Sequence, residues 1–255
     1  MSIEFQSGVA SGEYITVPVS ESAYPFSMSI WVKCPTDLPT SSARVIVMNL
    51  RESASYGIEV RVWEGTTTND VDVHFYIDGD GGGTRIREDA DTGTQDTWIN
   101  FILVVRAAND QELYTNGTSV TTNTISRDML GGTPPITPAQ IGGRASYAPH
   151  AGMKFAYYAF WSSEITGTNI TDLQTKTPDN ISNTPDNYVP FDTGTLTATI
   201  GGNASEVGTD VYQAAASDNP SLTGPGTSQT AALFNKIRSG YGPLEGAGMN
   251  GRLQR

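Results

Sequence analysis

Cysteine and histidine are nearly absent from this sequence. Cys34 is the only cysteine, so no disulfide can form within the chain, and the two histidines, His74 and His150, lie far apart. A structural zinc site needs four closely grouped nitrogen or sulfur ligands, which this spacing does not supply. The fold must therefore hold together without disulfide bonds, and we expect Cys34 and both histidines to be structural residues.

Basic residues and long apolar segments are also scarce. The chain has 15 Lys and Arg residues against 27 Asp and Glu residues, for a net charge of −12. This balance argues against nucleic acid as the main partner, because phosphate binding needs basic patches. No segment approaches the ~20 apolar residues of a membrane span. The N-terminus has no signal-peptide pattern, so we expect synthesis in the cytoplasm and no membrane partner.

Strand-like segments separated by turn residues dominate the chain. Apolar and polar residues alternate with a period of two in 26–33, 98–106 and 152–161, which is typical of half-buried strands. Asn116-Gly117 between two such segments predicts a tight hairpin. The full set of expected strands is 3–7, 13–17, 26–33, 44–50, 57–63, 72–77, 84–88, 98–106, 110–115, 118–122, 138–142, 152–161, 195–200 and 209–216.

Only one helix is expected, beginning near Ser162 and packed through Ile165, Ile170 and Leu173. Many strands with almost no helix predict an all-β sandwich or barrel. We assign residues 1–216 to this domain, with a loop at 177–187.

The C-terminal part of the chain has a different composition. Residues 217–230 are rich in Gly, Pro, Ser and Thr and are interpreted as a flexible linker. Residues 231–255 combine apolar and basic side chains, so we expect an extended tail that docks on a partner or on another copy of the chain. The residues expected to dock are Leu233, Phe234, Ile237, Tyr241, Leu244, Arg252 and Arg255.

The order of these motifs resembles the concanavalin A-like lectin/glucanase superfamily, in its laminin-G-like branch. The motifs are Phe-Ser-Met-Ser-Ile-Trp-Val at 26–32, Tyr-Thr-Asn-Gly at 114–117, Ile-Gly-Gly at 141–143 and the aromatic strand 152–161. The resemblance covers about residues 1–216. It implies an antiparallel jelly roll of two sheets packed face to face, with an extended C-terminal tail beyond it.

The two ends of the domain are also similar to a subset of this superfamily found in virion proteins of tailed bacteriophages. The similarity lies in the opening Met-Ser-Ile-Glu-Phe and in Ala-Ser-Asp-Asn-Pro at 216–220. It implies a structural protein of the virion surface, such as a capsid decoration, head fibre or tail-associated protein. Its expected partners are capsid or tail proteins, further copies of itself and a host-surface glycan. The alternative is a carbohydrate-binding lectin or adhesin module.

We expect no enzymatic activity. Glucanases of this fold resemble one another in a Glu-x-Asp-x-x-Glu strand, whose alternation places carboxylates on one face. No such motif occurs here, and the adjacent Glu88 and Asp89 would face opposite sides of a strand.

Two places are candidates for ligand binding. Trp31, Trp98 and Trp161 fall within strand patterns and are interpreted as core residues, whereas Trp63 stands at a strand end and is the best candidate for an exposed, sugar-stacking ring. Asp78 and Asp80 lie in a glycine-rich segment that is interpreted as a hairpin turn, with a calcium loop as the alternative. We assign no other cofactor.

Overall fold

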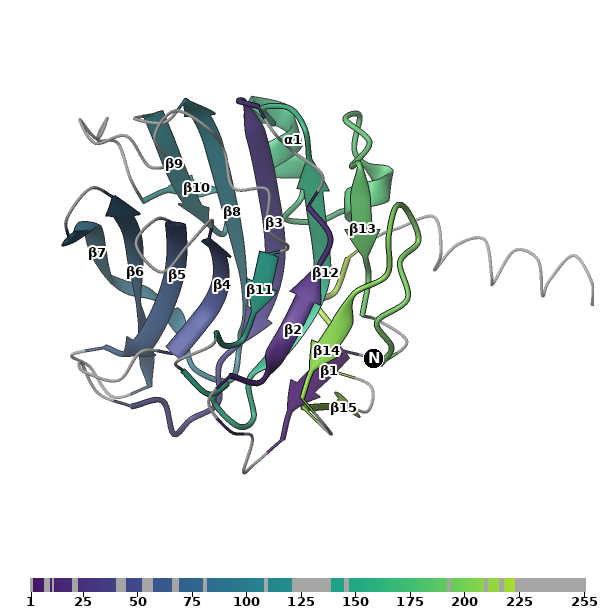
Figure 1. Cartoon of the computed structure of the whole chain (residues 1–255). Helices are drawn as coiled ribbons and strands as arrows, with labels where there is room; N and C mark the ends of the chain where they lie inside the picture. Colours follow the sequence, from purple (N-terminus) through teal and green to yellow (C-terminus); the bar gives the residue numbers. More distant parts are fainter. Residues whose placement is uncertain are drawn as a thin grey trace, which may run out of the picture.

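The computed structural model shows two antiparallel β-sheets packed face to face (Figure 1). The residues that it describes are 2–6, 10, 12–19, 23–39, 45–51, 57–65, 69–79, 82–107, 110–120, 139–144, 147–191, 194–208, 211–215 and 218–222. Within these ranges, the side chains of 51, 77–79, 82–92 and 215 are not described. Among these, no helix is long and apolar enough to cross a membrane.

The first sheet has eight described strands, in the order β10-β9-β8-β3-β12-β1-β15, with β13 also paired to β12. Its strands alternate apolar residues toward the second sheet, as the sequence pattern predicts. Their bounds are β1 (Ser2–Phe5), β3 (Phe26–Lys33), β8 (Trp98–Ala107), β9 (Asp110–Thr115), β10 (Thr118–Ser119), β12 (Lys154–Trp161), β13 (Asn187–Val189) and β15 (Tyr212–Ala215).

The second sheet has seven described strands, in the order β14-β2-β11-β4-β5-β6-β7. A bulge between Ile46 and Met48 turns both Val47 and Met48 toward the core, although they are adjacent in sequence. The strands are β2 (Tyr14–Val17), β4 (Val45–Arg51), β5 (Gly57–Glu64), β6 (Asp70–Gly79), β7 (Gly82–Thr94), β11 (Ala139–Ile141) and β14 (Ser205–Val207).

The core between the sheets confirms the all-β sandwich. It includes Phe5, Phe155 and Phe160, and Cys34 is fully buried in it as expected. Burial raises the pKa of the Cys34 thiol to about 12, so the sulfur stays in its neutral form.

The eight-stranded sheet is covered on its outer face as well. Its helix α1 (Gly167–Asp172) and a 3₁₀ turn (Pro178–Asn180) lie over the sheet. Ile165, Ile170 and Leu173 pack there as predicted, although the helix begins at Gly167 and not at Ser162. Trp31 and Trp161 are buried in this second cluster, on the side of the sheet opposite the core. Alternation lets β12 supply side chains to both clusters, and a bulge between Ala156 and Ala159 turns the adjacent Ala156 and Tyr157 to the same, outer side.

The strand expected at 195–200 is wrong: these residues do not form a strand, and among them only Ile200 makes an isolated bridge, to Tyr188. The loop expected at 177–187 is confirmed except for its last residue, because β13 begins at Asn187, where Tyr188 and Val189 fill the space beside β12. Strand β14 was missed because its side chains are exposed and show no apolar alternation.

Residues 218–222 lie against the domain, unlike the linker that the sequence predicts from residue 217. The Asp218 carboxylate accepts hydrogen bonds from Lys154 Nζ at 2.8 Å, Lys33 Nζ at 3.2 Å and Trp98 Nε1 at 3.2 Å. Pro220 is buried, and Leu222 packs on the outer cluster. Residues 223–255, with all the predicted docking residues of the tail, lie outside the described part of the chain.

The contacts of Asp218 predict a pH dependence of this segment. Burial alone would raise the pKa of Asp218, but the hydrogen bonds from Lys154, Lys33 and Trp98 outweigh it and hold the pKa below the ordinary 3.8. A lowered carboxyl pKa stabilises the fold above the unfolded-state value and loses that effect as the pH falls through the folded value. We expect the Trp98 indole N–H resonance to shift with a midpoint below 3.8, and this transition to vanish in Asp218→Asn. A midpoint at or above the ordinary value would contradict this interpretation.

Candidate functional site

A row of hydrogen-bonding side chains crosses the outer face of the seven-stranded sheet. Each of six strands supplies one member, and each member is in register with the next. The row, from β14 to β6, is Ser205, Thr16, Gln140, Asn49, Glu59 and Tyr76. It continues in register to Arg85 of β7, whose side chain is outside the described part of the structure. We call these six residues the polar row.

Strand alternation explains why the polar row faces outward. Thr16, Gln140, Asn49 and Glu59 each have a core residue on both sides, for example Ile15 and Val17 around Thr16 or Ile58 and Val60 around Glu59. Successive side chains of a strand point to opposite faces, so a polar residue between two core residues must lie on the outer face.

Side-chain contacts join neighbouring members of the row. Thr16 Oγ1 lies 2.8 Å from Ser205 Oγ, and Asn49 Nδ2 donates to Gln140 Oε1 at 2.8 Å. At Glu59 the carboxylate accepts from Arg61 Nε at 2.6 Å through Oε2 and from Arg144 Nη1 through Oε1. These contacts hold the side chains in fixed orientations, which is the preorganisation that a binding site needs.

Two guanidinium groups and two tyrosine rings complete this part of the face. Arg61 lies 3.9 Å above the ring of Tyr76, and Arg144 lies 4.5 Å from the ring centre of Tyr147. Such stacking orders the guanidinium planes while leaving their edges to donate.

Exposure decreases along the polar row from β14 to β5 and rises again at Tyr76 of β6. Ser205 is exposed and Thr16 and Gln140 are half-buried, Asn49 and Glu59 are only 0% and 1% exposed, and Tyr76 is half-buried. The accessible run of neighbouring members is therefore the β14-β2-β11 end, where the buried Asn49 orients Gln140.

The prediction for Trp63 is wrong, because its side chain is only 7% exposed. Strand β5 runs on to Glu64, so Trp63 is paired with Asp72 and does not stand at a free strand end. Its indole packs against the imidazole of His74, which is fully buried and structural as expected. Trp63 therefore offers no free ring face for a sugar.

The calcium alternative for Asp78 and Asp80 stays a prediction. Asp78 lies on β6 and is paired with Gly83 of β7, which confirms a β-hairpin at this point. Asp80 and the side chain of Asp78 are outside the described part of the chain. In that described part, no three His, Cys, Asp or Glu side chains converge on a metal-sized site.

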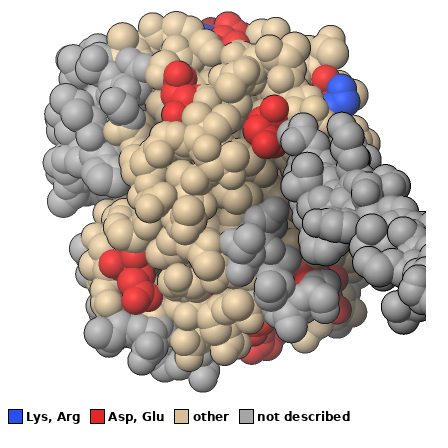
Figure 2. Space-filling model, turned by 90° about the vertical axis from the view of Figure 1, so that its right-hand side faces the viewer, with Lys and Arg blue, Asp and Glu red and all other residues tan. Residues whose placement is uncertain are grey.

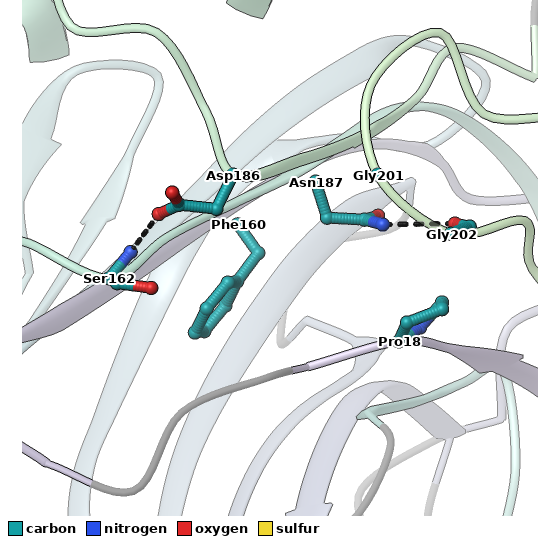
Figure 3. Close-up of a pocket in the computed structure, with 7 residues that line it drawn as sticks. All are labelled: Pro18, Phe160, Ser162, Asp186, Asn187, Gly201 and Gly202. Atoms are coloured by element: carbon teal, nitrogen blue, oxygen red, sulfur yellow. Dashed lines mark hydrogen bonds between the residues drawn. The ribbon is translucent and has the colours of Figure 1, made fainter.

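A separate pocket of about 240 Å³ lies at the edge of the sandwich (Figure 3). Both sheets contribute to it, since Pro18 follows β2 while Phe160 and Asn187 belong to β12 and β13. Its remaining walls are Ser162, Asp186, Gly201 and Gly202. Sequence reasoning missed this pocket and the polar row, because each is assembled from segments far apart in the chain.

The model of the concanavalin A-like lectin/glucanases superfamily, in its laminin-G-type form, matches residues 9–171, which is most of the sandwich. The chain belongs to this superfamily. No curated protein matches the chain.

Several solved structures are similar to this chain at low sequence identity. The native heptameric SAP-like pentraxin from Limulus polyphemus has 10% identity and a TM-score of 0.51, over 82% of this chain and 96% of that one. Domain 4 of AbnA, an arabinanase from Geobacillus stearothermophilus solved with arabinotriose, has 19% identity and a TM-score of 0.47, over 69% and 82%. The binding domain of botulinum neurotoxin serotype D has 14% identity and a TM-score of 0.46, over 68% of this chain. The chain spans about 45% of that binding domain.

Proposed function

We propose that the chain is a non-enzymatic carbohydrate-binding domain whose ligand lies on the accessible end of the polar row. The observation that carries this proposal is the straight run of hydrogen-bonding side chains in register across the sheet. Sugar hydroxyls both donate and accept, so they suit a surface that combines hydroxyl and amide groups. In the described structure no side chain accepts from Gln140 Nε2, which leaves that group to a ligand.

The positions of the carboxylates favour binding over hydrolysis. A glycosidase needs two carboxyl groups roughly 5–9.5 Å apart. Glu59 is held by two guanidinium groups. Asp72, another carboxylate on this face, is in register with Trp63, which lies four residues from Glu59 along β5. Four residues of a strand span roughly 13 Å, which is too far for that chemistry.

We test this function with a glycan array and a matched pair of variants. The labelled full chain is screened first, and the best oligosaccharide is then titrated by calorimetry. Gln140→Ala is expected to weaken binding about tenfold, as the loss of one well-placed hydrogen bond does. Gln213→Ala removes the same group from β15 of the other sheet and is expected to bind as the parent does. Equal affinities for the two variants would contradict a site on the polar row.

We further propose that this domain is carried on the surface of a tailed-phage particle, through its tail. The support is the similarity at residues 1–5 and 216–220 and the apolar and basic side chains of 231–255. A chain that ends at Gly226 keeps Asp218 and Leu222, and so keeps their contacts with the sheet. It is expected to bind glycan normally but to be lost from purified particles. If purified particles retain the shortened chain, the anchor lies on the sandwich and not in the tail.

A further inference from the structure

The pocket at the edge of the sandwich has the size of a single small ring. Its volume of about 240 Å³ is several times the ~30 Å³ share of one water molecule. It is smaller than the ~300–1,000 Å³ of pockets that hold drug-sized ligands. A compact molecule of one ring therefore fits this space better than an extended chain does.

The polar groups of the pocket are mainly acceptors. Asp186 Oδ2 accepts from the Ser162 backbone N–H at 2.5 Å, and no described group donates to Asp186 Oδ1. Asn187 is 95% buried and its Nδ2 donates to Gly202 O at 2.9 Å, while its Oδ1 has no partner among the described residues. Figure 3 shows the two side chains extending in opposite directions, Asp186 toward Ser162 and Asn187 toward Gly202. Acceptors on two sides of a small pocket suit a ring that carries hydroxyl donors on more than one side.

The opposite walls are apolar or made of bare backbone. The Phe160 ring and Pro18 form one side, and Gly201 and Gly202 form another. Gly201 has φ +78°, and a Cβ there would lie 2.6 Å from Asn187 Nδ2 and 2.7 Å from Asp186 O. Glycine is therefore required for the loop to close over the Asn187 amide. A sugar ring has C–H faces for the apolar walls and hydroxyls for the acceptors.

Charge favours a neutral ligand over an acidic one. The side of the molecule that bears β13 and β14 shows mainly uncharged surface with scattered Asp and Glu and little Lys or Arg (Figure 2). The exposed Asp186 carboxylate would repel a sugar acid.

We infer that this pocket binds one neutral monosaccharide residue, the terminal residue of the glycan that lies on the polar row. This inference rests on the proposed carbohydrate binding. Pro18 follows Thr16 by two residues, which is roughly 6–7 Å along the chain, and Gly202 precedes Ser205 by three. The pocket and the accessible end of the row are thus close enough for one oligosaccharide to reach both.

The test titrates free neutral hexoses, pentoses and uronic acids into the full chain, with binding followed by NMR. We expect one or more neutral sugars to bind and the uronic acids to bind about tenfold more weakly. Asp186→Asn keeps an oxygen for the Ser162 N–H but turns the other acceptor into a donor, and it is expected to weaken binding about tenfold. Asp37→Asn removes the same charge from an exposed turn outside the pocket and is expected to change nothing.

A second variant narrows the pocket without touching its polar groups. A Cβ at Gly202 would lie 3.0 Å from Pro18 Cγ, so Gly202→Ala should reduce monosaccharide binding while the melting temperature stays close to that of the parent. The inference is overturned if no monosaccharide binds, if uronic acids bind equally well, or if Asp186→Asn binds like the parent. If oligosaccharide binding then still depends on Gln140, the proposed function survives without the pocket. If monosaccharide binding depends on Asp186 but Gln140→Ala affects no glycan, the pocket binds sugar and the polar row does not.

Discussion

Replacing Glu59 by Ala is expected to lower the free energy of unfolding by about 3–5 kcal/mol, because it leaves a buried charge without its partner. Arg61 donates to Glu59 from a side chain that is only 5% exposed, and Arg144 donates to the other carboxylate oxygen. Removing the carboxylate strands the Arg61 guanidinium in a site that water does not reach. Urea unfolding of the full chain measures this loss as a lower midpoint with an unchanged slope.

Glu164→Ala is the matched control for this substitution. Glu164 also pairs with an arginine, Arg106, but the two side chains are 31% and 30% exposed. Exposed ion pairs contribute about 0–1 kcal/mol. If Glu59→Ala lowers the free energy of unfolding no more than Glu164→Ala does, the contacts of Glu59 with Arg61 and Arg144 do not stabilise the sheet as buried ion pairs.

The second large effect is expected at Gly142, in the Ile141-Gly142-Gly143 motif. Its φ is +80°, and a Cβ at this position would overlap the ring of Phe5. That ring is 1% exposed and packs edge-on against Phe155 at 5.3 Å, so it has no space to move. Gly142→Ala should therefore lower the free energy of unfolding by about 2–5 kcal/mol, because backbone strain and overpacking both contribute.

Gly167→Ala separates these two contributions. Gly167 also has a positive φ, +38°, but nothing lies within 4 Å of its missing Cβ. Gly167→Ala should therefore lower the free energy of unfolding only by the backbone cost of about 1–2 kcal/mol. Equal losses at Gly142 and Gly167, measured by the same urea unfolding, would show that overlap with Phe5 is not the cause.

The sandwich was predictable because its strands carry a local signal. Alternation in 26–33 and 98–106 predicts β3 and β8 within one residue of their observed ends, and Asn116-Gly117 forms the expected hairpin, with both residues at positive φ. The role of Gly142 is also explained once Phe5 is seen beneath it, but no local pattern connects residues 5 and 142.

The polar row was not predictable, because no local pattern connects residues that come from strands far apart in the sequence. Alternation in β5 places Glu59, Arg61 and Trp63 together on the outer face, but it does not show that Trp63 is covered there by His74 of the neighbouring strand. Which residues stand beside Glu59 depends on strand register, which pairs Gln140 with both Thr16 and Asn49 and brings Ser205 next to Thr16. Register over such sequence distances is fixed by the packing of the whole sandwich.

The position of a bound oligosaccharide on the sandwich decides the proposed function. The most direct measurement is the set of NMR shift changes in the isotopically labelled full chain when the best array ligand is added. We predict shifts of the Gln140 side-chain NH₂ group and of the Thr16 and Ser205 amides, with the Trp31 and Trp161 indole signals unchanged. Shifts confined to the eight-stranded sheet around Trp31, with Gln140 unaffected, would contradict a binding site on the polar row.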